Sequence, residues 1–281
     1  MPILALIAAL AGTLFIENVF ASNITIPRPR SLSSASAPSS LSVPSAPFVP
    51  LATSAPKPVI PASAPDPSTP SSVQSLNWAG YIANSGNFTS VSGTWTIPNV
   101  TDNLSFINAD AAWVGIGGVS SHDLIQAGTL TIVDPYGGVF NQAFIETLPD
   151  YSQDIPLAVN PGDSITATIS QQSPGYWNIS VKNNTTGEIY QTSTTYSSTL
   201  SSAEWIEEMP SLRRGFIPLD NFGTIQFTDA SVTQNGTAVT LAQAQAQRVD
   251  MINLDEQLIA ATSDLANDGI GFSVTRTGTQ I

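Results

Sequence analysis

Short runs in which apolar and polar residues alternate fill most of the chain after Leu76. A period of two places every second side chain on the same face, as in a half-buried β-strand. The runs are rich in β-branched and aromatic residues, and turn sequences such as Asn-Pro-Gly-Asp separate them. Strands are predicted over residues 90–98, 111–118, 124–133, 142–148, 163–170, 176–183, 188–196, 223–232 and 271–277. Many short strands at this spacing indicate an all-β, antiparallel sandwich or barrel.

One segment has a pattern that fits two kinds of element. Residues 242–266, AQAQAQRVDMINLDEQLIAATSDLA, form the one helix-like candidate of the chain. The alternating Ala-Gln start of this segment is equally typical of a strand. The pattern alone leaves both assignments open.

Residues 201–210, SSAEWIEEMP, place three glutamates in a chain that otherwise carries little charge. If this stretch is a strand, Glu204 and Glu208 share one face, while Trp205 and Glu207 share the other. Two carboxylates on one face of a sheet indicate either a solvated edge or the start of an active site. The same alternation predicts that Glu207 turns away from the pair, toward solvent.

The first quarter of the chain has a different texture. Residues 1–21 carry an apolar run that is too short for a bilayer and end in Val-Phe-Ala, as a cleaved signal peptide does. Residues 22–75 are dominated by Ser, Pro and Ala and are predicted to be a pro-segment or a linker. The domain is expected over 76–281. The protein is therefore expected to be secreted, extracellular and free of the membrane once the signal peptide is removed.

Composition narrows the possible functions. The 281 residues include 21 Asp and Glu but only 8 Lys and Arg, which gives a formal net charge of −13. This balance argues against nucleic-acid binding, which needs a basic surface. Few bases also mean little self-repulsion in acid, so the chain is suited to low pH, although an ordinary secreted acidic β protein is the alternative. Eight Asn-x-Ser/Thr sequons fit a secreted glycoprotein.

Several catalytic chemistries are excluded by residue type. The chain has no cysteine, so disulfides, thiol catalysis and thiolate metal sites are absent. Its one histidine, His122, follows two serines in a loop-like stretch and is expected at the surface. No spacing typical of a metal site or a bound cofactor occurs. Carboxylate and amide chemistry remains, carried by Glu146, the Glu204/Glu208 pair and Gln126, an amide inside an apolar strand.

The sequence resembles the glutamic peptidase (eqolisin) family of acid-acting secreted endopeptidases. The matching stretches keep the order and approximate spacing of the family and cover nearly all of residues 76–281; they lie at 77–82, 91–98, 111–118, 124–129, 143–150, 162–165, 203–208 and 217–232. The resemblance implies a sandwich of two large antiparallel β-sheets bent around a substrate groove. It also implies polypeptide substrates, no cofactor, and catalytic roles for Gln126 and Glu204. We expect a monomer.

The chemistry of these two residues suits peptide hydrolysis in acid. A glutamate with an ordinary pKa of about 4.3 acts first as the general base for water and then, once protonated, as the acid for the leaving amine. A neutral amide holds the water through its oxygen and donates its N–H to the oxyanion. We assign the first role to Glu204 and the second to Gln126.

Four further residues are expected to support or bind substrate around this pair. Trp78 and Trp113 line the groove as apolar walls, or else they simply pack in the core. Glu146 and Glu208 lie close enough to Glu204 to raise its pKa.

The chain departs from the family pattern at several groove positions. Where this chain has Gly117 and Met209, the family usually has an acid at each position. Where this chain has Leu130 and Thr131, the family tends to have an aromatic residue and an acid. The family also has aromatic residues on both sides of the glutamate that corresponds to Glu146. These changes make the groove less acidic and less aromatic, which affects substrate preference more than mechanism.

Two rival functions remain open at this point. A β-sandwich glycoside hydrolase would use Glu146 and Glu204 as its pair of carboxyls. A non-catalytic secreted module for carbohydrate binding or adhesion would leave Glu204 and Gln126 merely exposed.

Overall fold

The computed structural model describes residues 72–100, 106–212 and 215–278. The predicted signal peptide and nearly all of the Ser/Pro/Ala-rich segment lie outside the described residues. Within them every regular element is a β-strand. The described part of the chain contains no helix long and apolar enough to cross a membrane.

The strands of the described chain are β1 (Val73–Ser75), β2 (Trp78–Ala83), β3 (Phe88–Thr96), β4 (Asn108–Gly117), β5 (Leu124–Val133), β6 (Val139–Thr147), β7 (Gln153–Asp154), β8 (Ser164–Ser173), β9 (Tyr176–Asn183), β10 (Ile189–Thr195), β11 (Ala203–Glu208), β12 (Ser211–Leu212), β13 (Gly215–Phe216), β14 (Thr224–Gln234), β15 (Thr237–Val239), β16 (Gln247–Ile252), β17 (Leu258–Thr262) and β18 (Phe272–Arg276). Every strand predicted from alternation is present. β1 lies just before the predicted boundary at residue 76.

Sixteen of these strands form one sheet. Along its main path the order is β10-β9-β8-β3-β14-β18-β17-β16-β2-β11-β4-β5-β6-β7. Neighbours on this path are antiparallel, whereas β1 adds to β16 in parallel and β15 adds to β14. β12 and β13 pair separately as a short hairpin.

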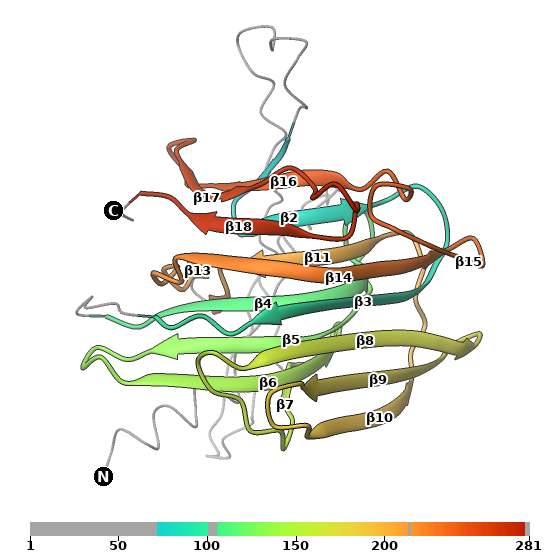
Figure 1. Cartoon of the computed structure of the whole chain (residues 1–281), viewed down its shortest axis with the longest axis horizontal. Coiled ribbons are helices and arrows are strands. Elements are labelled where there is room, and N and C mark those ends of the chain that lie inside the picture. The colour runs from blue at the N-terminus through green and yellow to red at the C-terminus, as the bar shows by residue number, and fades with distance from the viewer. Residues whose placement is uncertain (1–71, 101–105, 213–214, 279–281) are drawn as a thin grey trace, which may run out of the picture.

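The sheet folds over on itself into a sandwich. Figure 1 shows β14, β3, β8, β9 and β10 in one layer and β2, β11, β4, β5 and β6 in the other. Strands of the two layers contact each other, as β3 and β8 do with β4. The predicted antiparallel β-sandwich is therefore confirmed, and its two layers are halves of one continuous sheet joined through β18, β17 and β16.

Apolar side chains cover both faces of the layer that contains β11. Trp205 belongs to a large cluster between the layers, together with residues such as Trp95 and Phe227. Its neighbour Ile206 belongs to a second cluster on the opposite face, together with residues such as Trp113. Alternation along β11 thus sends side chains into two separate buried regions. The face with Ile206 is called the outer face of this layer below.

The segment 242–266 is not a helix. It contains a turn over 241–245 and then β16 and β17, which pair with each other. The strand interpretation is wrong for most of the Ala-Gln start, which forms the turn, and the strands of this segment are limited to β16 and β17. β16 fills the position between β2 and β17 in the sheet, and this tertiary pairing decides between two patterns that are locally equivalent.

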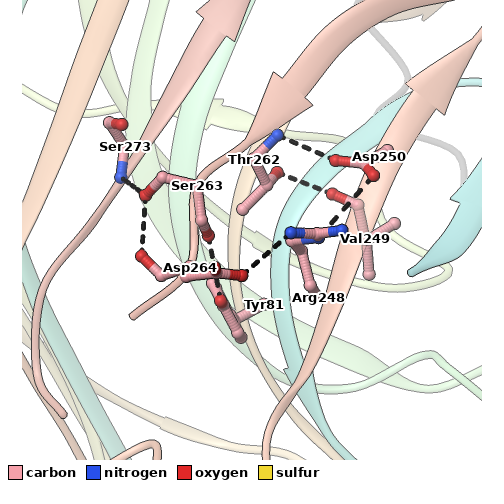
Figure 2. A network of polar contacts seen from close by, with 8 residues as sticks. All are labelled: Tyr81, Arg248, Val249, Asp250, Thr262, Ser263, Asp264 and Ser273. Carbon is pink, nitrogen blue, oxygen red and sulfur yellow. Dashed lines mark hydrogen bonds and ion pairs between the residues drawn. The ribbon is translucent and has the colours of Figure 1, made fainter. Parts of the chain in front are cut away.

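A polar network holds the place where the two layers join (Figure 2). Arg248 on β16 lies 2.9 Å from the Asp264 carboxylate and 3.7 Å from that of Asp250. The hydroxyl of Tyr81 on β2 donates to the carbonyl of Ser263, at 2.9 Å. These contacts link both sides of the bend in a chain with few cations.

Buried carboxyl groups also lie between the layers. Glu207 on β11 and Asp110 on β4 point to the same inner face, and both are almost completely buried, as is Asp220. The expectation that Glu207 faces solvent is therefore wrong. Alternation gives the face correctly, but the second layer of the sheet covers that face.

Burial makes these groups hard to ionise. It raises the pKa of Asp110 to about 7, although hydrogen bonds with Asp220 and Thr131 oppose this effect. Burial also raises the pKa of Glu207 well above its ordinary value, and the charges of Asp110, Asp220 and Glu208 add to it. Folding thus favours the protonated form of both groups.

We predict that the fold loses stability as the pH rises toward neutrality. The contribution of these carboxyls to the free energy of unfolding is complete below their unfolded pKa of about 4. It is lost as the pH rises toward the folded pKa, which is about 7 for Asp110. Glu207→Gln removes one such group, so at pH 7 it should melt above the parent protein by about 2–4 °C, the shift that about 1 kcal/mol gives in a domain of this size. Near pH 3.5 the two melting temperatures should agree.

Thermal melts followed by circular dichroism at both pH values provide the measurement. Glu188→Gln, on an exposed turn, is the matched control and should change neither melt. A Glu207→Gln protein that gains nothing at pH 7 would show that Glu207 is not held protonated by the fold.

Candidate functional site

Four residues on adjacent strands form one row across the outer face. Glu204 on β11 pairs with Gly115 on β4, Gly115 pairs with Gln126 on β5, and Gln126 pairs with Glu146 on β6. Directly paired residues of neighbouring strands lie on the same face of a sheet. The register therefore brings together Glu204, Gln126 and Glu146, which are far apart in sequence. This arrangement is called the site row below.

Gly115 leaves the centre of the site row without a side chain. A Cβ atom there would lie 2.9 Å from Leu124 Cδ1 and 2.9 Å from Trp113 Cζ3. Glu204 and Gln126 consequently flank a glycine whose backbone is covered by the ends of the Leu124 and Trp113 side chains. Gly115 could not be identified from the sequence alone, because only the pairing of β4 with both β11 and β5 gives its position.

The amide of Gln126 is held at one end. Its Nε2 donates to Glu146 Oε2 at 2.5 Å, and both side chains are buried. A carboxylate only accepts hydrogen bonds, so the amino end of the amide has to face it. The carbonyl oxygen of Gln126 then faces away from Glu146, and it has no hydrogen-bond partner among the described residues.

The carboxyl of Glu204 is fully buried, and the Ser202 hydroxyl is the side-chain donor that acts on it. Burial raises the pKa of Glu204 well above its ordinary value. The nearby Ser202 hydroxyl opposes this shift, and the charge of Asp123 adds to it. A buried carboxyl whose pKa is strongly perturbed by desolvation is typical of a functional site.

Asp123 behaves in the opposite way to Glu204. Desolvation pushes its pKa up, but hydrogen bonds from Ser121, Thr199 and Ser198 outweigh it and lower the pKa. The Thr199 backbone N–H donates to the Asp123 carboxylate at 2.7 Å. Asp123 was not predicted as a site residue, and nothing in its local sequence distinguishes it.

Glu208 lies further along the outer face, among the side-chain donors Asn77, Trp113 and Trp78. Asn77 Nδ2 donates to Glu208 Oε1 at 3.0 Å, and Trp113 Nε1 donates to Glu208 Oε2 at 2.8 Å. Burial raises the pKa of Glu208 to about 8, while the donors Trp113, Trp78 and Asn77 act against it. Asn77 was also not predicted from the sequence.

The two predicted groove tryptophans are neighbours. The rings of Trp78 and Trp113 meet edge to face, with centroids 5.2 Å apart and an interplanar angle of 78°. Both are fully buried and belong to the outer-face cluster; Trp113 is the next outer-face residue after Gly115 on β4, and Trp78 on β2 pairs with Glu208. Their packing fits a role in the core, and their position beside the site row fits a role as apolar walls for substrate.

Two expectations concern residues outside the row. His122 is exposed, as predicted. Among the described residues, no group of three or more His, Cys, Asp or Glu side chains is placed to hold a metal ion.

Comparisons with known proteins agree with this geometry. The model of the peptidase A4 family matches residues 76–275. Scytalidopepsin B of Scytalidium lignicola is 33% identical over 192 residues, which cover 64% of this chain and 72% of that protein. Aspergillopepsin-2 of Aspergillus niger is 26% identical over 214 residues, or 67% of this chain and 74% of that protein. A crystal structure of scytalido-glutamic peptidase with a transition state analog inhibitor is 28% identical with a TM-score of 0.62, over 72% of this chain and 98% of the other.

We predict that two glycines of the outer face differ in their tolerance of a methyl group. A Cβ at Gly128 would lie 2.3 Å from the backbone oxygen of Ala112 and 2.5 Å from Trp113 Cβ, neither of which can easily move. At Gly115 the nearest atoms are the ends of two side chains. Gly115→Ala should therefore lower the free energy of unfolding by about 1–3 kcal/mol, the usual range for overpacking, and Gly128→Ala by more.

Chemical denaturation of both variants at acidic pH provides the measurement. Gly187→Ala is the control for a methyl group without a steric clash, because that turn glycine has open space around it but a φ of +82°. It should cost only the strain of that φ. Equal losses for Gly115→Ala and Gly128→Ala would contradict the prediction.

Proposed function

The chain belongs to the peptidase A4 family of glutamic endopeptidases, the eqolisins, and we propose that it cleaves polypeptides with Glu204 and Gln126 as its catalytic pair. The observation that carries this proposal is the site row, in which the two side chains flank Gly115 on the same face. A peptide carbonyl above this glycine has a carboxyl on one side and an amide on the other.

The proposed reaction is direct attack by water. The ionised Glu204 removes a proton from water while the resulting hydroxide adds to the carbonyl carbon. The Gln126 carbonyl oxygen accepts the other hydrogen of that water, and its second N–H donates to the oxyanion. Glu204 then gives its proton to the leaving nitrogen, the C–N bond breaks, and the carboxylate is restored.

Glu146 has a supporting part in this proposal. Its hydrogen bond with Gln126 Nε2 fixes which end of the amide is turned toward the centre of the row. An amide that rotated by half a turn would present its N–H groups to the water and its oxygen to Glu146. Glu146 therefore prepares Gln126 before the substrate arrives.

The rival functions fit the site less well. Glycosidase carboxyls lie roughly 5–9.5 Å apart with the sugar between them. Glu146 and Glu204 are three strands apart, which is about 14 Å of sheet at the usual spacing, and Gln126 stands between them. A binding module would expose Glu204 and Gln126, and both are buried.

We also propose that the enzyme is secreted and works outside the cell. The apolar start of the chain and the Ser/Pro/Ala-rich segment support this, with residues 22–75 as a pro-segment or a tether. Sequencing the N-terminus of protein recovered from the culture medium tests it. A mature chain that still begins at Met1 would contradict it.

Activity is expected only on the acidic side of neutrality. At low pH the rate falls as Glu204 gains its proton. Burial raises the pKa of Glu204, so this fall occurs at a higher pH than it would with an exposed glutamate as the base. On the neutral limb, ionisation of Asp110 near pH 7 and of Glu207 destabilises the fold. The pH profile of kcat/KM on an unfolded protein substrate is the measurement. An optimum at neutral pH would contradict the mechanism.

Exchanging the two functional groups tests the catalytic pair itself. Glu204→Gln keeps the shape but cannot carry a proton, and Gln126→Glu replaces a neutral donor with a second carboxyl. Each should lower kcat by at least about 100-fold, the usual cost of one oxyanion-hole donor. Gln126→Glu should be nearly silent in a glycosidase, so its effect separates the two enzymes.

The matched controls carry the same exchanges at exposed positions. Glu188→Gln lies on a turn, and Gln226→Glu lies on β14 in the other layer. Both should keep full activity. If folded Gln126→Glu retained most of its proteolysis at its own pH optimum, Gln126 would have no place in the mechanism.

A further inference from the structure

The indole of Trp113 connects Glu208 with the centre of the site row. One end of the ring system, Nε1, donates to Glu208 Oε2 at 2.8 Å. Another edge, Cζ3, comes within 2.9 Å of the position that a Cβ at Gly115 would take. The ring therefore extends from the Glu208 carboxyl to Gly115, the residue between Glu204 and Gln126 in the site row.

The surroundings of this ring leave it one orientation. Gly128 lies beneath it, since a Cβ there would be 2.5 Å from Trp113 Cβ. Trp78 meets it edge to face on the outer face of the layer. Asn77 holds the second oxygen of Glu208 at 3.0 Å, so the carboxyl is itself fixed. Loss of the Glu208 hydrogen bond would leave a buried indole N–H without its acceptor, which favours a shift of the ring.

We propose that Glu208 is a positioning residue of the peptidase: by holding the Trp113 indole, it sets the shape of the space between Glu204 and Gln126. The inference rests on the proposed catalytic pair. It differs from the expectation that Glu208 acts on the ionisation of Glu204. Glu208 does not touch the reacting atoms and works only through Trp113.

Two observations favour a mechanical role over an electrostatic one. The pKa of Glu204 is raised by burial and by the charge of Asp123 and is lowered by Ser202. Glu208 is not among the groups that act on it. Burial also keeps the pKa of Glu208 at about 8. Glu208 is thus protonated through the acidic range, and a neutral carboxyl has little charge with which to influence Glu204. Its hydrogen bond to Trp113 persists, because a protonated carboxyl still accepts through its carbonyl oxygen.

A double-mutant cycle between Glu208 and Trp113 tests the proposal. Glu208→Leu removes the acceptor, and Trp113→Phe removes the N–H donor and part of the ring. Each should lower kcat by at least about 10-fold, because a displacement near 1 Å at a reacting centre has effects of this size or larger. The double variant should be no slower than the slower single variant, since both changes break one connection. Effects on kcat that multiply in the double variant would overturn the proposal.

The conservative variant and the pH profile separate positioning from charge. Glu208→Gln keeps one acceptor oxygen for Trp113 and should retain more activity than Glu208→Leu. The acid limb of kcat/KM should stay in place in both, because Glu204 titrates as before. A shift of that limb in Glu208→Gln would support the electrostatic role and contradict ours. Glu188→Gln, on its exposed turn, is the control for the exchange.

A readout without substrate keeps this test independent of the proposed function. Near-ultraviolet circular dichroism reports the fixed environment of the indoles, so Glu208→Leu should lose the part of the signal that Trp113→Phe also loses. If Glu204→Gln proved fully active, the catalytic proposal would fail while this spectral result would still show whether Glu208 holds Trp113. Should Glu208→Leu not fold, Trp113→Phe with Glu208→Gln completes the cycle. An unchanged spectrum in the folded Glu208 variants would overturn the inference.

Discussion

The hydrogen-bond register of β11, β4, β5 and β6 is the constraint on which the site depends. Side chains alternate along a strand, so a slip of one residue in any of the three pairings would send a member of the row to the other face. Gly115 would then no longer stand between Glu204 and Gln126. The glycines of the outer face add to this constraint, because Gly128 lies against the backbone of Ala112 with no room for a side chain.

Burial of carboxyls in a chain with few cations gives the protein its acid character. Glu204, Glu207 and Glu208 all lie on β11, are all buried, and all have raised pKa values with desolvation as the main cause. In acid Glu207 and Glu208 are neutral and act as ordinary polar members of the interior. The same strand becomes costly to bury once protons are scarce. A fold with ion pairs at these positions would have the opposite dependence on pH.

The strands could be predicted from the sequence because the alternation of apolar and polar residues is a local property. Each of the nine stretches predicted between residues 90 and 277 contains a strand. The resemblance to the eqolisins identified Gln126 and Glu204, which periodicity alone would have assigned to an edge or a solvated face. Long-range pairing decided the rest. It places Gly115 between the two predicted residues, turns β16 and β17 into strands, and covers Glu207 with the second layer. No window of sequence contains that information, because each case depends on segments more than 80 residues apart or on the fold of the whole sheet.

The order of strands in the sheet also governs how the protein has to be made. β2 lies between β11 and β16, and β3 lies between β8 and β14, so the earliest strands of the main path find their neighbours late in the chain. A nascent chain that has not reached Gln247 has an unpaired edge along β2, one strand away from Glu204. The active site of this protease is therefore assembled only after most of the domain has been synthesised. Such non-local topology folds slowly, because the early strands wait for partners that lie far along the chain.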